Sequence, residues 1–497
     1  MTTHPSVVLL DGAQSGDRDV LGGKAYSVNR MRTLGLPVPP AFALPTHVCG
    51  IYHSNDRELP DQVWNEVVEA VRQLEADTGR TFGSGPSPLL VSVRSGAAQS
   101  MPGMMDTVLN LGLTPDLVEA LAAESGDSAW ADDTWSRFQK CYKDIVLAEV
   151  SESAPQSPPS DPWEQLRAAI GAVFDSWTNE RVRSYRERHN LGEGTGTAVT
   201  VQAMVFGNRD DESGTGVLFS RDPSSGEPAL YGEWLANAQG EDVVSGEQTP
   251  TQIGVLAEQK PELYAELNRI ATILEKELRD LVDIEFTVES GRLYMLQCRQ
   301  GKRSPAAAVR IAVDLAEAGI ITRAEAISRV SAEHVESLLK SVQVDEEHDT
   351  DGVWATGLGA SPGVASGHVA RDLDEATTLT EQGKEVILVR KFTAPDDVPA
   401  MFQSVGVLTE VGGATSHAAL VCREIGLPCV VGAGEGLVEK LAGRVITIDG
   451  TTGKVHAEGS VNTSSVTGNH YVRTLIEYAS ACDAADHPIR RLDAVTG

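Results

Sequence analysis

The stretch Gly412-Gly413-Ala414-Thr415-Ser416-His417-Ala418-Ala419 decides the local fold around it. It separates two apolar runs, 405–409 and 418–425, and this pattern predicts a strand, a tight turn and a helix. Two glycines allow the turn, and Thr415 and Ser416 are residue types that cap helix N-termini. His417 then falls in the first helical turn, where free N–H groups and the helix dipole favour negative charge. An imidazole there can carry a phosphoryl group covalently, although a glycine-rich turn with an incidental histidine would look the same.

Composition excludes several function classes. The chain has 497 residues, enough for about three domains. Its net charge is −30, with 71 acidic against 41 basic residues, so we expect no nucleic-acid and no membrane partner. It contains no apolar run of about 18 residues, and its N-terminus does not resemble a signal peptide. Six cysteines without a C-x-x-C pair predict reduced thiols, and we therefore expect a cytoplasmic protein.

Changes in composition along the chain predict an α+β and α/β multidomain protein. Residues 1–340 mix strands and helices as in a large α+β domain, and residues 353–460 alternate strands and helices as in a small α/β domain. Residues 341–352 form an acidic linker, and 461–497 contain a polar linker, a helix at 470–481 and a tail. Polar linkers on both sides suit a mobile carrier, but two ordinary interdomain loops would have the same composition.

Two separate stretches of the first region carry cations suited to phosphate. Arg94 ends an apolar strand and precedes a Gly/Ser-rich loop, and a guanidinium can grip phosphate oxygens with its planar fork. Backbone N–H groups around Gly103 can wrap a polyphosphate. Lys24 follows a Gly-Gly pair and is the second candidate cation, unless it is a solvated surface lysine.

Four polar residues lie on a predicted strand pair near residue 290. Strand alternation puts Asp283 and Glu285 on one face, and Gln297 and Arg299 likewise share a face. Two carboxylates, an amide and a guanidinium could together bind Mg²⁺ and a triphosphate. The alternative is the solvent-facing side of an antiparallel hairpin.

Three strings in the chain resemble one enzyme family. The stretch at 412–419 resembles the phosphohistidine motif of enzymes related to pyruvate phosphate dikinase and phosphoenolpyruvate synthase. Residues 91–107 resemble the triphosphate loop of the dikinase ATP-grasp domain, and residues 359–363 resemble the entry motif of its phosphohistidine domain. The resemblance implies an ATP-grasp nucleotide-binding domain followed by a small swivelling phosphohistidine domain. The sequence differs from the dikinase pattern at Ala98 and Val411, where that pattern has Arg.

The same resemblance implies roles for individual residues. His417 is the phosphoryl carrier, Thr415 positions it, and Arg94 and Arg299 are the other catalytic residues. The implied Mg²⁺ ligands are Glu285 and Gln297, with Asp283 as a further ligand. Gln202 and Met204 lie at the adenine, and Glu241 at the ribose. The implied ATP-binding set is Lys24, Arg94, Gly103, Met105, Asp106, Gln202, Met204, Glu241 and Arg299.

The implied activity is that of a phosphotransferase, pyruvate phosphate dikinase-like with paired acceptors. The chain would phosphorylate its own His417 from ATP with Mg²⁺, releasing AMP with phosphate or pyrophosphate. It stops about 40 residues after the small domain, whereas the dikinase's C-terminal barrel needs roughly 250, so we expect that barrel to be absent. The acceptor is then held by a separate barrel-type protein or is another small molecule. The alternative is a non-catalytic or regulatory ATP-binding paralogue. For the oligomeric state, a homodimer is an open alternative.

Overall fold

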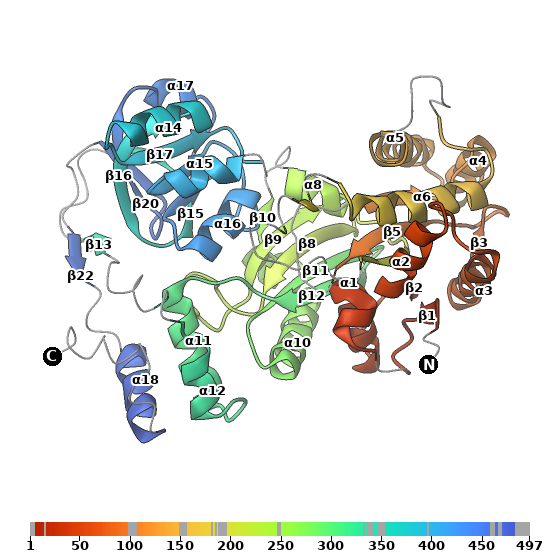
Figure 1. Ribbon diagram of the computed structural model, residues 1–497, viewed down its shortest axis with the longest axis horizontal. Coiled ribbons are helices and arrows are strands. Elements are labelled where there is room, and N and C mark those ends of the chain that lie inside the picture. The colour runs from red at the N-terminus through yellow and green to blue at the C-terminus, as the bar shows by residue number, and fades with distance from the viewer. Residues whose placement is uncertain are drawn as a thin grey trace. The chain divides into compact units, whose positions relative to one another are not determined.

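The computed structural model divides into two compact units (Figure 1). Unit 1 consists of Met1–Gly214 and Phe286–Arg299, and unit 2 of Thr215–Glu285 and Gln300–Gly497. The boundary between them runs within the hairpin at 282–300. The structure describes residues 5–13, 16–97, 107–148, 157–179, 182–183, 186, 196–245, 250–331, 334, 342–344, 353–394, 397–457, 463–465 and 470–482.

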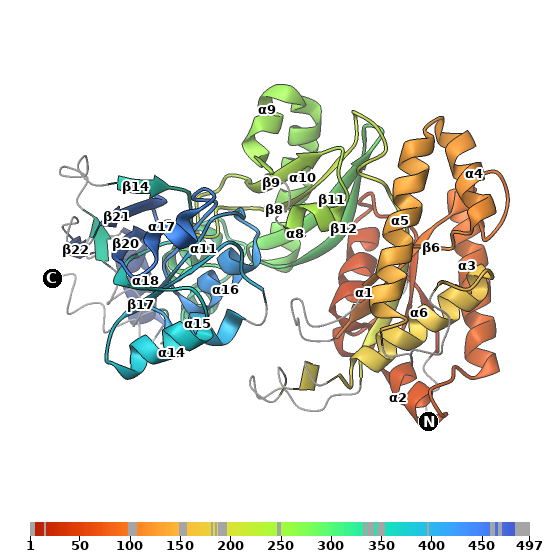
Figure 2. The ribbon, with the colours of Figure 1, turned by 90° about the horizontal axis from the view of Figure 1, so that it is seen from above.

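Unit 1 is built on a five-stranded antiparallel sheet with the order β1-β2-β7-β5-β6. Figure 2 shows helices α3, α4, α5 and α6 around this sheet, and their apolar side chains share one core with its strands. The small strands β3 and β4 form a separate parallel pair. The bounds are β1 Val8–Leu9, α1 Arg18–Thr33, β2 Ala41–Leu44, α2 Thr46–Ser54, α3 Asp61–Thr78, β3 Thr81–Phe82, β4 Pro88–Leu89, β5 Val91–Gly96, β6 Thr107–Leu111, α4 Pro115–Ser125, α5 Ser128–Ile145, α6 Pro162–Ser176 and β7 Ala198–Ala203.

A second five-stranded sheet follows β7, with the order β10-β9-β8-β11-β12. Helix α10 begins with a proline at its first position and buries Leu267, Ile270, Ala271 and Leu274, the spacing of an amphipathic helix. The bounds are β8 Gly214–Phe219, β9 Tyr231–Ala236, α8 Gly240–Ser245, β10 Thr251–Gln252, the 3₁₀ turn η1 Ile253–Val255, α9 Leu256–Gln259, α10 Pro261–Leu278, β11 Val282–Glu289, β12 Arg292–Gln300, α11 Pro305–Glu317 and α12 Arg323–Ser328.

Residues 353–457, here called the histidine segment, form a mixed eight-stranded sheet with the order β14-β21-β20-β16-β17-β18-β19-β15. Strands β16 to β19 are parallel to one another and the outer pairs are antiparallel. Two separate apolar clusters lie in it, one including Met401 and Ala418, the other including Leu408 and Leu441. The bounds are β14 Val353–Thr356, β15 Leu358–Ser361, β16 Val364–Ala370, α14 Leu373–Glu381, β17 Val386–Arg390, α15 Val398–Gln403, β18 Gly406–Thr409, α16 His417–Ile425, β19 Cys429–Val431, α17 Leu437–Leu441, β20 Val445–Asp449 and β21 Lys454–Ala457.

The chain enters and leaves the histidine segment through a two-stranded ribbon. Strand β13, Val342–Val344, pairs antiparallel with β22, Thr463–Ser465. Beyond the ribbon, helix α18, His470–Ala481, packs on α11 and α12 through Leu475 and Ala479 (Figure 1). The histidine segment is therefore an insertion whose two ends are held together. The sequence indicated the two polar linkers but not their pairing.

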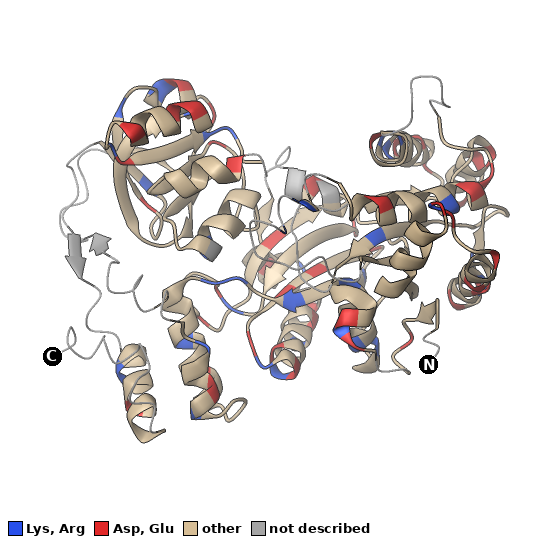
Figure 3. Cartoon of the chain, in the orientation of Figure 1, with Lys and Arg blue, Asp and Glu red and all other residues tan. Residues whose placement is uncertain are grey.

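The observed elements agree with the fold class expected from the sequence. Strand β18 and helices α16 and α18 lie where the pattern places them. Figure 3 shows acidic residues spread over helices such as α3, α4 and α10, as the net charge of −30 requires. Within the described residues, every helix is too short or too polar to cross a lipid bilayer.

Candidate active site

The turn before α16 presents His417 at the head of the helix, as the sequence predicts. Gly412 has φ 119°, a backbone angle that favours glycine. Ser416 is the N-cap, and its hydroxyl accepts a 3.5 Å hydrogen bond from the Ala419 N–H. His417 is the first residue of the helix, whose first turn has N–H groups without partners inside the helix. This end of α16 is suited to a group that gains negative charge.

The His417 ring is held by Thr393. The Thr393 hydroxyl lies 3.0 Å from Nδ1 of His417. Burial lowers the pKa of His417 below its ordinary value of 6.5, and the carboxylate of Asp397 opposes this shift. The imidazole is therefore neutral at pH 7, with one ring nitrogen available as a nucleophile.

The turn is bound by a buried carboxylate from β9. Glu233 is only 2% exposed, and its oxygens accept hydrogen bonds from the N–H groups of Ala414 and Thr415. The Thr415 hydroxyl donates a further bond to Glu233 at 2.5 Å. Thr415, predicted to position His417, therefore ties the turn to the sheet that contains β8 and β9.

Gly413 makes this approach sterically feasible. A Cβ atom at this position would lie 1.7 Å from Oε1 of Glu233. Any side chain larger than hydrogen would overlap the carboxylate, so the close contact between turn and β9 requires glycine here.

Arg423 binds the turn through a backbone carbonyl oxygen. It is 1% exposed and donates to the carbonyl oxygens of Ala414, at 2.6 Å, and Ala360, at 3.1 Å. Its guanidinium carbon lies 5.4 Å from the centre of the Phe219 ring on β8. Desolvation lowers the pKa of this guanidinium, although an arginine stays charged at neutral pH. The side chain thus links the turn, β15 and β8.

The structure brings Lys24 to the end of β5 that carries Arg94. Helix α1 breaks at Gly22, whose φ is 74°, and a Cβ there would lie 1.8 Å from the Gly96 carbonyl oxygen. The Gly23 N–H donates to Ala97 at 2.9 Å. Lys24 and Arg94 are both half-buried in unit 1. Gly103, Met105 and Asp106 lie outside the described residues, as does Ala98.

The residues predicted to bind Mg²⁺ lie on the β11–β12 hairpin. Asp283 and Glu285 are on β11 in unit 2, whereas Gln297 and Arg299 are on β12 in unit 1. Oε1 of Gln297 is buried without a hydrogen-bond partner among the described residues, which fits an oxygen ligand for a metal. Among the described residues, no three His, Cys, Asp or Glu side chains form a group that could hold a metal ion. Mg²⁺ usually takes only one or two carboxylates and completes its shell with substrate phosphates and water.

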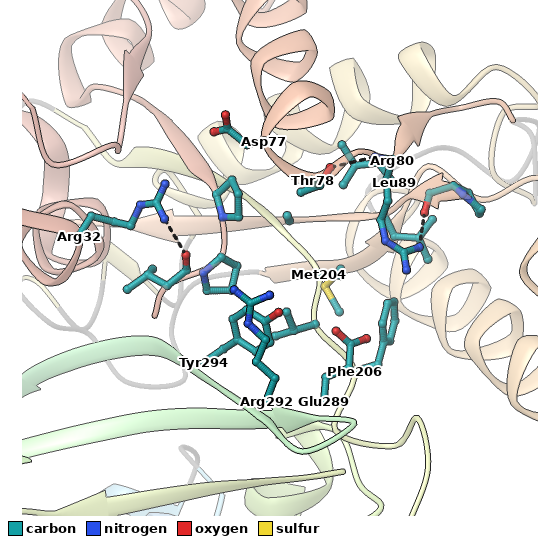
Figure 4. Close-up of a pocket in the computed structure, with 17 residues that line it drawn as sticks. Arg32, Asp77, Thr78, Arg80, Leu89, Met204, Phe206, Glu289, Arg292 and Tyr294 are labelled. Atoms are coloured by element: carbon teal, nitrogen blue, oxygen red, sulfur yellow. Dashed lines mark hydrogen bonds between the residues drawn. The ribbon is translucent and has the colours of Figure 1, made fainter. Parts of the chain in front are cut away.

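A cavity of about 420 Å³ in unit 1 lies at one of the two residues predicted to bind adenine (Figure 4). Met204 lines it, together with Phe206 from the segment after β7. Gln202 does not line the cavity; it is buried and donates to the Pro39 carbonyl at 3.4 Å, so its amide is already used in the fold. Glu241 lies in α8, and its side chain is outside the described part.

Three residues around the turn were missed by sequence reasoning. Thr393 and Asp397 lie in the connection after β17 and contact or influence His417 only in the folded chain. The sequence around Glu233 does contain one indication of its role. A lone carboxylate within the apolar strand Tyr231–Ala236 is seldom buried without a partner, so it indicates a polar contact. The sequence could not indicate which partner that would be.

Comparison with known proteins matches both parts of the chain. A family model for the pyruvate phosphate dikinase AMP/ATP-binding domain matches residues 54–265 and 260–318. A model for the mobile domain of PEP-utilising enzymes matches residues 382–453, which include His417.

Curated relatives extend the match over most of the chain. A pyruvate, phosphate dikinase of Rhizobium meliloti is 43% identical over 88% of this chain and 56% of its own length. The Clostridium symbiosum enzyme is 40% identical over 91% of this chain and 58% of its own length. A chloroplastic Arabidopsis thaliana enzyme is 42% identical over 88% of this chain and 51% of its own length. The chain thus spans about half the length of the curated relatives it matches. Because the AMP/ATP-binding model alone matches more than half of its residues, the chain belongs to the pyruvate phosphate dikinase family.

Proposed function

We propose that this chain is an ATP-dependent phosphotransferase that phosphorylates its own His417 and passes the group to an acceptor. The observation that carries the proposal is the setting of His417, a neutral imidazole at a helix N-terminus with Nδ1 at 3.0 Å from Thr393. The matched AMP/ATP-binding and mobile domain models support a donor site and a carrier within one chain.

The tautomer of His417 decides which nitrogen attacks. If Nδ1 carries the proton and donates to the Thr393 oxygen, Nε2 keeps its lone pair for phosphorus. In a dikinase-like step the Nε2–P bond forms at the β-phosphate of ATP, and the P–O bond to AMP breaks. Phosphate then accepts the γ-group, so that pyrophosphate leaves and a phosphohistidine remains. The Thr393 contact survives every step, because Nδ1 takes no part in bond formation.

The donor site is assigned from the predicted residues. Lys24, Arg94 and Arg299 would meet the phosphates, together with Gly103, Met105 and Asp106, which follow β5 in the chain. Glu285, Gln297 and Asp283 would hold Mg²⁺, which neutralises charge that develops on the transferred group. Gln202, Met204 and Glu241 would lie along the nucleoside. The half-buried positions of Lys24 and Arg94 at one end of β5 support this arrangement.

The contact between Glu233 and the turn supports a docked state of the carrier. The paired strands β13 and β22 allow the histidine segment to leave as one body, because both ends pass through one ribbon. The released carrier would meet an acceptor on a separate barrel-type protein or a small molecule. Pyruvate is the first acceptor to test, since the relatives are named for pyruvate and phosphate.

Labelled ATP tests the proposal directly. Incubation with Mg²⁺, phosphate and ATP labelled at the β-phosphate should give a phosphoprotein that is labile to acid and stable to base, with AMP as product. His417→Ala should abolish the label, whereas His368→Ala, on β16 of the same segment, should keep it. Equal labelling of the His417 variant would overturn the assignment. Label from the γ-phosphate alone, with ADP as product, would make the reaction that of a simple kinase.

A further inference from the structure

An ion pair joins the end of β17 to Asp397. Arg390 is the last residue of β17, and its Nη2 lies 3.2 Å from Oδ1 of Asp397. The Nη1 group of Arg390 donates to the Arg371 carbonyl oxygen at 2.8 Å, and the Arg390 carbonyl oxygen accepts from the Glu410 N–H at 3.0 Å. The backbone and the side chain of Arg390 are therefore both held in place.

Asp397 binds the backbone next to Thr393 with its second oxygen. Oδ2 of Asp397 accepts from the Ala394 N–H at 2.9 Å, and the Asp397 N–H donates to the Ala394 carbonyl oxygen at 2.9 Å. Thr393 and Asp397 are both buried, and the Thr393 hydroxyl lies 3.0 Å from Nδ1 of His417. A continuous series of contacts thus leads from Arg390 to the imidazole.

Several elements bring titratable groups toward His417. Helix α16 packs against β15, β18 and β19, and of these three described strands only β19 carries an ionisable side chain, the buried thiol of Cys429. Glu233 of β9 accepts from the N–H groups of the turn, and Glu410 accepts from a backbone N–H of α17. Arg423 of α16 donates to backbone carbonyl oxygens. These three charged side chains therefore have partners of their own.

Asp397 is the charged residue that acts on the His417 ring. Burial lowers the pKa of the imidazole, and the Asp397 carboxylate opposes this effect. Lys391, in the same connection, is exposed, so solvent screens its charge. A cation 3.2 Å from the Asp397 carboxylate cancels part of the carboxylate's field. The effect of Asp397 on the ring therefore depends on Arg390.

We propose that Arg390 is a positioning residue for the phosphoryl carrier: through Asp397 it holds Thr393 against Nδ1 of His417 and balances the charge beside the ring. This inference rests on the proposed use of His417, and it adds a residue that acts on the ring only through other side chains. Arginine suits the role, because its planar fork binds a carboxylate and a carbonyl oxygen at the same time.

Removing the cation and removing the carboxylate should have opposite effects on His417. Arg390→Met leaves the Asp397 carboxylate without its counter-charge, so the imidazole should take up a proton at a higher pH than in wild type. Asp397→Asn removes the negative charge, so protonation should need a lower pH. In the double variant the carboxylate is already absent, and its titration should match that of Asp397→Asn alone.

The experiment follows the His417 ring by NMR in the full, unphosphorylated chain with isotope-labelled histidine. His417→Gln identifies the resonance among the 11 histidines. Arg390→Gln should shift the titration in the same direction as Arg390→Met, whereas Arg390→Lys keeps the charge and should keep the wild-type titration. Arg371→Met is the matched control, because Arg371 is similarly exposed and pairs with Glu375 in the same segment. It should leave the His417 titration unchanged.

The rate of His417 labelling from ATP provides a second measurement, made at a pH where the ring is neutral. Arg390→Met should lower this rate by about two- to fivefold, because an ion pair with a half-exposed partner is weak. Arg371→Met should keep the wild-type rate. Equal rates for wild type and Arg390→Met would contradict the positioning role.

Two titration results would overturn the inference. An unchanged or lower titration midpoint in both Arg390→Met and Arg390→Gln would show that the cation does not balance Asp397. A higher midpoint in the double variant than in Asp397→Asn would show that Arg390 acts by packing and not through the carboxylate. Both results come from unphosphorylated protein and do not depend on labelling. Failure of the proposed function would instead appear as wild-type protein that ATP does not label at His417.

Discussion

The carboxylate of Glu233 and the hydroxyl of Thr415 lie 2.5 Å apart and are both buried, although 182 residues separate them in the chain. The same carboxylate also accepts the backbone N–H groups of Ala414 and Thr415. A strand of the second sheet thus satisfies the donors of the turn that holds His417. The contact is polar throughout, so water can replace each bond when the turn leaves. This makes the contact suitable for a carrier that must dock and depart.

Glu233 should control docking of the carrier. Glu233→Ala removes a charged acceptor of three hydrogen bonds, and each such bond is worth about 1.5–3 kcal/mol. The initial rate of His417 labelling should therefore fall on the order of 10- to 100-fold, measured by rapid quench with labelled ATP. Glu227→Gln changes an exposed carboxylate that pairs with Arg310, and should leave the rate within about twofold. Similar rates in both variants would contradict a docking role for Glu233.

Gly413→Ala tests the close approach without removing any bonding group. The new methyl would overlap Oε1 of Glu233, which should exclude the docked state and slow labelling on the order of 100-fold. Gly254→Ala is the matched control, because a Cβ at that position meets no atom within 4 Å. The two variants are compared by labelling rate and by thermal melting. A normal rate in a folded Gly413 variant would show that the turn reacts without this contact.

The acid limit of labelling should follow the pKa of His417. Burial lowers that pKa below 6.5, so the ring loses its proton at a lower pH than an ordinary histidine does. The labelling rate should therefore rise with pH and become constant before neutrality. Asp397 opposes the shift, and Asp397→Asn should therefore move the acid limb to lower pH. The asparagine oxygen can still accept from the Ala394 N–H. A shift toward higher pH would contradict the assigned effect of Asp397.

Arg299 should matter for chemistry more than for folding. Arg299→Ala removes a half-buried cation proposed to meet the phosphates, and it should slow phosphoenzyme formation on the order of 100-fold. Arg269→Ala, on the exposed face of α10, provides the matched loss of charge. Rates from single-turnover labelling, with melting temperatures as a check, separate the two effects. Equal rates would place the phosphate site elsewhere.

Local pattern was enough to predict part of this structure. The helix at His417 follows from a cap residue, two glycines and an apolar run that are adjacent in the chain. The helix His470–Ala481 was likewise predicted. Our interpretation passed over α10, although the proline at its start and the apolar spacing were available signals.

The contacts of the site could not be predicted, because they join distant parts of the chain. Thr393 lies 24 residues before His417, and the two meet only because β17 and β18 run parallel side by side. Glu233 reaches Thr415 across a span of 182 residues. The pairing of β13 with β22 likewise depends on the ends of a folded segment coming together, and three-residue strands leave little trace in sequence.

Mapping the phosphoryl group is the measurement that tests the central claim most directly. The chain is mixed with ATP, Mg²⁺ and phosphate, quenched in base within one turnover, digested, and analysed by tandem mass spectrometry. The account predicts a phosphoryl group on His417, appearing at the rate at which AMP is released. Phosphate on another residue, or AMP release without phosphorylated His417, would contradict it.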